Sequence, residues 1–402
     1  MKNGELTPVD TESKKEGGVI NILRKRSIFN YLLTTIAGLA LITYCLGCKP
    51  LKIPQKPLSL GQFTNILTIS ISPDGSQILF DGCGHKEYPA CTIYRFDRDN
   101  NRLFRYLPRT PHESLYGGRY SPSSNLIAFS LLPVDDAGND VFEDSQIALM
   151  QQDGIGFRVV TESKGLKTQP AISFDEKQLA FFKSEMSSAG SPLRKQRTRA
   201  LKYDLYSLNL LTSKETRLTK YGFYSAGNAC FAGDNKKILF EGDSPMRTPY
   251  SEQAADYREQ FKSKYKDNII FSIKTDGTDK NKELIPYFTL SYGSKMPVLF
   301  KDGSLVFEGR EGVHQGFIYY YKRSPDGKLD KLTYKELGKG TGEDGKSLIV
   351  VQGMTGTPDG RLLLILNYNQ GTNQRYIRVL DLSSRKLTDI IPPTSIENIN
   401  LR

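Results

Sequence analysis

A recurring turn sequence constrains this chain more than any other feature. In Ile69–Phe80, ISISPDGSQILF, an apolar run leads into Ser-Pro-Asp-Gly and a second apolar run leaves it. Pro73 presets φ for the first corner of a type I turn, and Gly75 occupies a position where positive φ carries no steric cost. Turn residues between two β-rich runs indicate a β-hairpin.

Imperfect copies of this hairpin follow along the chain. Their equivalent turn residues are Asp74, Ser123, Asp175, Asp234, Asp302 and Asp359. Each hairpin precedes a second pair of strand-like segments, such as Thr92–Leu107 after the first copy. Four strands per unit at a period of about 50 residues are typical of β-propeller blades, whose sheets bury their faces against their neighbours. We therefore predict an all-β, six-bladed propeller with four antiparallel strands per blade.

The repeat resembles the WD-like propeller repeats of the TolB family. The resemblance rests on the turn, on the aliphatic-aromatic strand after it, and on the third strand Ile93–Asp97, IYRFD. It covers roughly residues 66–392 and implies a fold more than a function, because one fold hosts many activities. Three copies depart from the pattern: Ser123 and Ser124 replace Asp-Gly, and Phe174 and Gly233 replace proline.

These patterns divide the chain into a leader and a propeller. We expect a disordered polar leader at 1–30, a hydrophobic signal or anchor segment at 31–48 and a proline-rich tether at 49–65. Ring closure should use a strand from one terminus, for which residues 58–65 are the only spare strand-like segment. The blades are expected at about 66–107, 115–161, 168–219, 226–286, 295–334 and 348–393, followed by a tail at 394–402.

The hydrophobic segment predicts export. Tyr31–Gly47 carries no charge and follows Arg24-Lys25-Arg26, as in a secretory signal or signal anchor. Leu46-Gly47-Cys48 resembles the end of a bacterial lipobox, although Cys45 stands where that motif usually has an aliphatic residue. We expect lipidation of Cys48, with an uncleaved anchor or a buried core segment as alternatives. Because the basic residues precede the segment, the propeller should lie outside the cytoplasm, in a bacterial cell envelope.

An exported protein can keep disulfides. Cys83 and Cys91 lie at the two ends of the loop DGCGHKEYPAC, which joins the second and third strands of the first blade. Adjacent antiparallel strands bring such positions within disulfide reach, so we predict a bond between them. Two reduced thiols, or a metal pair completed by His85, are the alternatives. Cys230 lies in a predicted inner strand and is expected to be a small core residue.

The net charge of +11 limits the classes of partner. In an exported protein the available polyanions are anionic lipid head groups and acidic glycans rather than nucleic acid. An ordinary excess of lysine and arginine on a solvated surface explains the same net charge without any partner.

The long departures from the repeat all fall in loops on one face of the predicted propeller. Loops on rigid scaffolds often carry function, so we expect this face to bind partners. The loop Pro133–Ser145 is acidic, Ser184–Lys202 is basic, and Asp243–Lys266 contains an expected helix with an aromatic stripe. The binding-face candidates are Asp135, Asp136, Asp140, Glu143, Asp144, Arg194, Lys195, Arg197, Arg199, Tyr257, Phe261 and Tyr265.

Each loop has a simpler explanation. The acidic loop has the oxygen chemistry for Ca²⁺ but lacks the spacing of a recognised calcium loop, so a solvated loop is the simpler interpretation. The basic loop could pair with its acidic neighbour. The aromatic stripe could dock the helix onto the propeller itself.

The sequence contains no Gly-x-Ser-x-Gly elbow, Walker loop or His-Glu-x-x-His motif, and we expect no cofactor. Its three histidines, His85, His112 and His314, fall on loops of the decorated face, an arrangement similar to the metal site of oligogalacturonate lyases. We therefore predict a non-catalytic envelope protein that binds other envelope proteins or lipoproteins. A metal-dependent lyase or hydrolase on acidic polysaccharide, and a purely structural envelope protein, are the alternatives.

Overall fold

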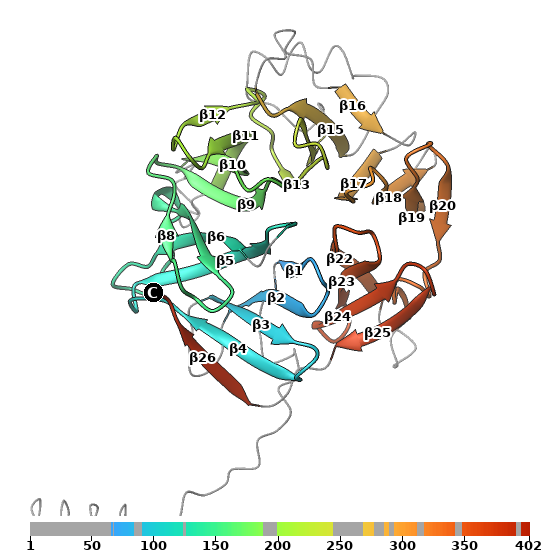
Figure 1. Ribbon diagram of the computed structural model, residues 1–402, viewed down its shortest axis with the longest axis horizontal. Coiled ribbons are helices and arrows are strands. Elements are labelled where there is room, and N and C mark those ends of the chain that lie inside the picture. Colours follow the sequence, from blue (N-terminus) through green and yellow to red (C-terminus); the bar gives the residue numbers. More distant parts are fainter. Residues whose placement is uncertain are drawn as a thin grey trace, which may run out of the picture. The chain divides into compact units, whose positions relative to one another are not determined.

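Six β-sheets are arranged as blades around a common axis in the computed structural model (Figure 1). The structure describes residues 66, 68–83, 91–123, 126–187, 199–243, 268–276, 285–288, 293–311, 317–341, 348–390 and 395–402. The chain divides into two units, Met1–Gln55 and Lys56–Arg402, and all described residues belong to the second. The expected leader, hydrophobic segment and tether therefore lie outside the described residues.

The first three blades follow one another along the chain, each with its strands paired antiparallel in sequence order. Blade one contains β1 (Ile69–Ile71), β2 (Gln77–Gly82), β3 (Thr92–Asp97) and β4 (Arg102–Leu107). Blade two contains β5 (Glu113–Tyr120), β6 (Leu126–Pro133), β7 (Gln146–Gln151) and β8 (Arg158–Val159), with the short 3-10 helix η2 (Phe142–Asp144) between β6 and β7. Blade three contains β9 (Leu166–Ile172), β10 (Gln178–Ser187), β11 (Arg199–Asn209) and β12 (Glu215–Arg217).

The last three blades repeat the arrangement. Blade four contains β13 (Ala226–Phe231), β14 (Lys237–Gly242), β15 (Ile269–Lys274) and β16 (Ile285–Phe288). Blade five contains β17 (Gly293–Leu299), β18 (Leu305–Glu311), β19 (Phe317–Arg323) and β20 (Leu329–Leu332). Blade six contains β21 (Gly340–Thr341), β22 (Leu348–Gly356), β23 (Leu362–Asn369), β24 (Gln374–Asp381) and β25 (Lys386–Ile390). The predicted all-β, six-bladed fold is confirmed.

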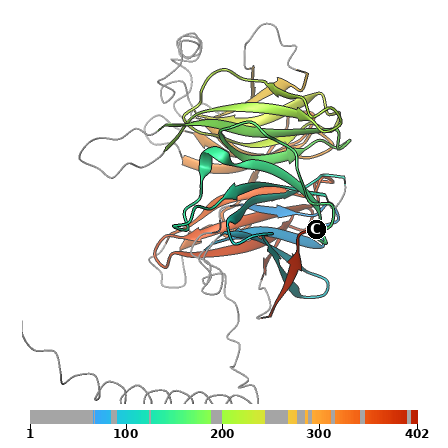
Figure 2. The same cartoon turned by 90° about the vertical axis from the view of Figure 1, so that its left-hand side faces the viewer.

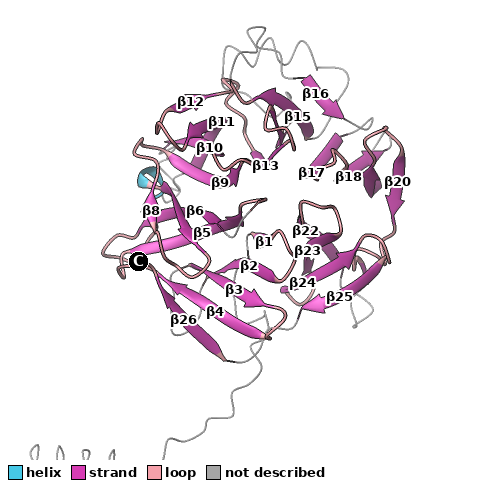
Figure 3. Cartoon of the chain, in the orientation of Figure 1, coloured by secondary structure: helices cyan, strands magenta, loops and turns pink. Residues whose placement is uncertain are grey.

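Strands dominate the described chain, as Figure 3 shows. None of the helical segments within the described residues has the length and apolar character that crossing a bilayer requires. Figure 2 views the ring edge-on: the strands cross its thickness, so the loops that join them lie on its two faces.

The repeated turn is built as its sequence predicts. In blade one the Gly75 N–H donates to the Ser72 carbonyl at 2.9 Å, and the Gln77 N–H donates to Ser72 Oγ at 2.9 Å. Two of the departing copies form the same turn, with Glu176 and Asn235 at φ of 55° and 58° in place of Gly75. Side-chain hydrogen bonds support both residues there: the Phe174 N–H donates to Asn235 Oδ1 at 2.7 Å, and the Ser121 hydroxyl donates to Glu176 Oε1 at 2.6 Å.

Six apolar clusters hold the blades together, one between each pair of neighbours. Each cluster joins the facing sides of two sheets, as when Phe182 of blade three packs near Phe240 of blade four, with 6.1 Å between the ring centroids. The cluster between blades six and one includes Ile69, Phe80 and Leu364. The ring therefore closes by the same packing that joins every other pair of blades.

The C-terminal segment corrects the expected tail at 394–402. Its residues form β26 (Ile396–Asn400), which pairs parallel to β4 as a fifth strand on the outer edge of blade one (Figure 1). A strand from the C-terminus thus joins the first blade. The segment 58–65, expected to close the ring, lies outside the described residues.

The innermost strands share a feature that the repeat does not reveal. The pairing of β5, β9, β13, β17 and β22 with the next strand shifts register at a β-bulge. Four of these bulges contain a residue at positive φ: Gly117, Gln169, Asn228 and Met296. Bulges re-aim side chains and are frequent near functional sites.

Candidate binding face and axial cavity

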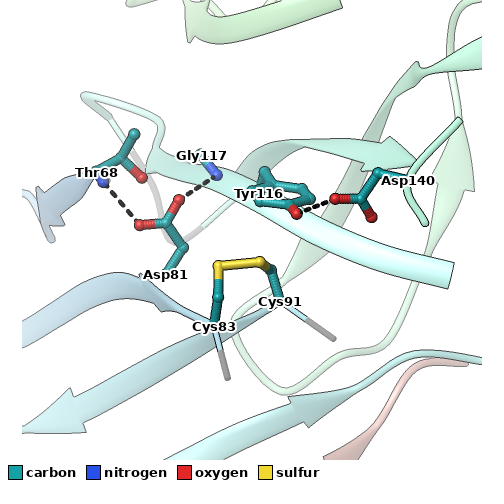
Figure 4. The surroundings of a disulfide bond; sticks show 7 residues. All are labelled: Thr68, Asp81, Cys83, Cys91, Tyr116, Gly117 and Asp140. Atoms are coloured by element: carbon teal, nitrogen blue, oxygen red, sulfur yellow. Dashed lines mark hydrogen bonds between the residues drawn. A yellow bond between two sulfur atoms is a disulfide. The ribbon is translucent and has the colours of Figure 1, made fainter. Parts of the chain in front are cut away.

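The loops after β2 and β6 meet on one face of the ring. The Leu115 N–H donates to the Cys91 carbonyl at 3.0 Å, and the Val134 N–H donates to the His112 carbonyl at 2.8 Å. These bonds tie the loop of blade one, the connection to blade two and the acidic loop into one surface, which we call the loop face. Figure 4 shows part of this surface.

The structure brings Cys83 and Cys91 together in a disulfide at the base of the first loop (Figure 4). Both cysteines are buried, at 9% and 7% exposure, so the bond joins the two ends of the loop inside the protein. His85 lies in the part of this loop outside the described residues. Cys230 is a free thiol of intermediate exposure in β13.

The acidic loop is ordered by its own first carboxylate. Asp135 accepts hydrogen bonds from the N–H groups of Ala137 at 3.0 Å and Asn139 at 2.8 Å. These bonds favour the ionised form and lower the pKa of Asp135, led by the bonds from Asn139. The loop's own hydrogen bonds to Asp135 therefore support a defined shape.

Of the other four carboxylates of the acidic loop, two have a partner and two have none within the described residues. Asp140 accepts a hydrogen bond from the hydroxyl of Tyr116, a side chain of β5 (Figure 4), and Asp144 lies 3.7 Å from Lys164 in an exposed ion pair. Burial raises the pKa of Tyr116, with Asp140 as the next cause, so the phenol remains a donor. Asp136 and Glu143 are exposed and make no side-chain bond within the described residues.

Lys167, which sequence reasoning missed, anchors the far end of the acidic loop. Its side chain is fully buried. Its ammonium donates to the carbonyl oxygens of Ser145 at 2.8 Å and Gly165 at 3.2 Å, and to that of Ser163. Burial, and secondarily Lys183, lower the pKa of Lys167 to about 8. A lysine at the second position of a strand gave no signal that carbonyls would surround it.

Two carboxylates, buried Asp81 and partly buried Glu241, connect neighbouring blades at the bulges. Asp81 of β2 accepts from the N–H of Thr68 at 2.7 Å and from that of Gly117 in blade two at 3.2 Å (Figure 4). Glu241 of β14 occupies the equivalent place in the repeat and accepts from the N–H of Met296 in blade five at 2.9 Å. Each acceptor thus satisfies the bulge of the following blade.

The innermost strands of all six blades line a cavity of about 110 Å³ on the ring axis. Arg119 of β5 is the one charged side chain among the described residues that line it. Its guanidinium reaches β13, where it donates to the Ala229 carbonyl at 3.4 Å and to Asn228 Oδ1 at 3.5 Å.

Several predicted site residues lie outside the described residues. These are Cys48, His85, Arg194, Lys195, Arg197, Tyr257, Phe261, Tyr265 and His314. Arg199 begins β11, and only its backbone is described. The pairing of the acidic and basic loops, and the aromatic stripe, therefore remain predictions.

The described part of the loop face offers no preformed metal site. Within the described ranges, no three His, Cys, Asp or Glu side chains are grouped so that they could hold a metal ion. His112 is exposed there, but its two expected partners lie outside those ranges. A three-histidine site therefore stays a prediction.

Solved structures resemble this arrangement of blades. TolB from Acinetobacter baumannii matches with a TM-score of 0.53 and 14% identity, over 82% of this chain and 66% of that one. The chain has a propeller fold similar to that of TolB. Since it spans less than two thirds of that protein and shares little sequence with it, the likeness shows the fold alone.

Two further structures align over much of the chain. TolB from Agrobacterium tumefaciens, described as putative, matches with a TM-score of 0.42 and 18% identity, over 67% of this chain and 80% of that one. An oligogalacturonate lyase in complex with manganese matches with a TM-score of 0.48 and 14% identity, over 82% of this chain and 78% of that one. No protein-family model and no curated protein matches the sequence.

Proposed function

We propose that this protein is a non-catalytic propeller of the bacterial cell envelope that binds protein partners through its loop face. The observation that carries the proposal is the acidic loop of blade two. Asp135 and Lys167 hold its two ends through hydrogen bonds. The side chains of Asp136 and Glu143 are exposed and make no hydrogen bond within the described residues. Rigid loops that present free charges are suited to binding, because little ordering entropy is lost when a partner docks.

The charge of this loop indicates the chemistry of the partner. Two exposed carboxylates in a loop that is otherwise internally bonded would face lysine or arginine side chains across an interface. Such pairs contribute more to the rate and specificity of association than to its affinity. The partner surface should therefore be basic, and association should weaken as ionic strength rises.

Envelope anchoring is the second part of the proposal. It rests on the uncharged segment Tyr31–Gly47 and on Cys48 at its end. Intact mass of the protein purified from membranes, beside a Cys48→Ser variant, tests it. A chain that starts at residue 48 with added acyl mass, absent in the variant, supports a lipoprotein, whereas an unmodified chain that is soluble in the cytoplasm contradicts envelope anchoring.

Site-specific photo-crosslinking tests the loop face. A photoreactive residue at position 136 or 143 should trap one partner in the native envelope, and the same residue at position 99 serves as the matched control. Asp99 is exposed in the β3–β4 turn, and the adjoining Arg98 N–H bonds to Ser76 of the β1–β2 turn, on the face opposite the loops.

The expected result is a crosslink from the loop face only. In a variant that carries both Asp136→Lys and Glu143→Lys, with the photoreactive residue moved to a neighbouring loop position, this crosslink should be lost. Equal crosslinking from both faces, or a partner that still binds the doubly substituted loop, contradicts the proposal. Circular dichroism of the variant confirms that the propeller remains folded.

A further inference from the structure

The axial cavity has a lining of mixed polar and apolar groups, with a single charged side chain among the described residues. Each of the six innermost strands contributes to its lining. Its volume of about 110 Å³ is well above the ~10–15 Å³ that a cavity needs to hold one water. The apolar wall residues include Ile71, Ile172, Val298, Leu299 and Met354.

Arg119 is poorly satisfied in this cavity. Its two contacts, at 3.4 Å and 3.5 Å, are long beside the ~2.7–2.9 Å of a charge-assisted hydrogen bond. Its Nε is buried and has no hydrogen-bond partner. Burial lowers the pKa of the guanidinium, which nevertheless stays charged because its ordinary value is so high.

The nearest acidic groups do not neutralise Arg119. Glu241 is connected to it only through Asn228, whose Nδ2 donates to Glu241 Oε2 at 3.0 Å, and that carboxylate already accepts from the N–H of Met296. Cys230 also lines the cavity, but burial raises the pKa of its thiol to about 11, so it is neutral at pH 7.

We propose that the axial cavity binds a carboxylate with an apolar body, held by the guanidinium of Arg119. Arg119 is partly buried, with its Nε atom inaccessible. A partly buried charge without a counter-charge loses hydration, and an anionic ligand offsets that loss. The planar fork of a guanidinium fits a carboxylate with two parallel hydrogen bonds. The aliphatic part of the lining, which includes Ile71 and Val298, would receive the apolar body of the ligand.

The single positive charge selects among anions. A phosphate group at pH 7 carries about −1.5 to −2 charges and several strong acceptor oxygens, and the described lining offers one cation for them. A carboxylate carries one charge, which Arg119 balances. A chain terminus and a free short-chain acid present the same group, so the cavity chemistry does not separate these two sources.

This inference stands apart from the proposed function. It uses only the axis of the ring, whereas the proposed function uses the acidic loop on one face. A partner could bind the loop face while the cavity stays empty, and the reverse is equally possible.

Ligand binding to the purified full-length chain tests the proposal. Butyrate, hexanoate and phenylacetate are titrated by calorimetry, with the corresponding primary amides as uncharged controls. The acids should bind saturably, and the amides should not. Bound acid should also slow alkylation of Cys230, measured by mass spectrometry of the peptide that carries it so that Cys45 and Cys48 do not interfere.

Three variants separate a role for Arg119 from nonspecific effects. Arg119→Met should weaken acid binding at least ~10-fold, because a charge-assisted pair is lost. Arg119→Lys should bind with intermediate affinity, since it keeps the charge and loses the fork. Arg158→Met removes an exposed arginine of β8 and should bind like the parent.

Without ligand, Arg119→Met should melt no lower than the parent, because it removes a partly buried charge that has no counter-charge. If Arg119→Met misfolds, the Arg119→Lys titration and the Cys230 protection in the parent still decide the question. Acid binding that is absent from the parent, or that is unchanged in both Arg119 variants, overturns the proposal.

Peptides distinguish the two sources of the carboxylate. A tripeptide with an apolar C-terminal residue is compared with its C-terminal amide. Tighter binding of the free peptide than of any short acid identifies a chain terminus as the ligand, and the opposite order identifies a free acid. Both results support a carboxylate site, whereas equal binding of the peptide and its amide contradicts it.

Discussion

Removal of residues 395–402 tests how much the C-terminal strand contributes to the ring. This segment crosses several parts of the propeller: Ile396 packs against the cluster between blades six and one, whereas Ile399 and Leu401 pack against the cluster between blades one and two. Beyond the strand, the Arg402 N–H donates to the Gly154 carbonyl at 3.0 Å. The segment therefore straps three blades at their outer edge.

The size of the effect follows from these contacts. Three half-buried aliphatic side chains contribute about 1 kcal/mol each, half of the value for full burial. The two backbone hydrogen bonds that join Arg402 to blade two add about 1 kcal/mol each. The ion pair of Arg102 and Glu397 is 52% and 46% exposed and adds about 0.5 kcal/mol or less.

If the ladder with β4 roughly offsets the cost of ordering the strand, truncation should lower the free energy of unfolding by about 5 kcal/mol. The thermal midpoint should fall by on the order of 5–10 °C. Differential scanning calorimetry measures the midpoint. Hydrogen exchange should also show faster exchange in β4, whose outer edge becomes free.

Glu397→Gln is the matched control, because it removes the ion pair and keeps the strand; it should change the midpoint by no more than about 1 °C. A truncated protein that melts with the parent, and whose β4 amides exchange at the parent rate, would refute the strap. An equal fall in Glu397→Gln and in the truncated protein would show that the charge pair, rather than packing, holds the segment.

Three more predictions concern the bulges, the turns and the disulfide. Asp81→Ala leaves the N–H groups of Thr68 and Gly117 without their acceptor, so it should lower the free energy of unfolding, measured by urea denaturation, by about 2–4 kcal/mol. The control Asp99→Ala, in an exposed turn, should lower it by less than about 0.5 kcal/mol. Equal losses in the two variants would contradict the role of Asp81. Hydrogen bonds led by that from Ser383 lower the pKa of Asp381 to about 2, and the bond from Ser173 lowers that of Asp175. Since the folded values lie below the unfolded ones, this stability is present above about pH 4 and is lost as pH falls toward 2; Asp381→Asn and Asp175→Asn together should flatten the melting curve against pH in that window, and a parallel curve would count against it. Replacing Cys83 and Cys91 by serine should lower the melting temperature, at a cost of about 2 kcal/mol for so short a loop, and a reducing agent should then have no further effect, in contrast to the parent; an unchanged midpoint would argue that the bond is absent.

Local chemistry made the fold predictable. The Ser-Pro-Asp-Gly turn needs only its own residues, because Ser72 and Asp74 supply the bonds and Gly75 supplies the positive φ. The strands on either side follow from apolar runs that are buried at nearly every position, as in β1, β2 and β6, so the number of blades could be counted from the turns alone. The same reasoning located the loop face and its acidic loop.

Features fixed by distant partners were not predictable. Residues 396–400, IENIN, carry a weak strand pattern, and their partner strand β4 lies near the other end of the chain. The bulges place Gln169, Asn228 and Met296 at positive φ, which their side chains do not favour. Arg119 follows two glycines in an ordinary strand, and only the closed ring reveals that it faces the axis.

The acceptors at the bulges bear on how such a ring could be altered. Asp81 belongs to blade one but completes the backbone of blade two, and Glu241 does the same for blade five. A blade excised or duplicated at its sequence boundaries would leave its own bulge unsatisfied or its acceptor unused. The unit that can be exchanged without loss is therefore half of one blade with half of the next, and unfolding at one blade should spread to its successor before it spreads to its predecessor.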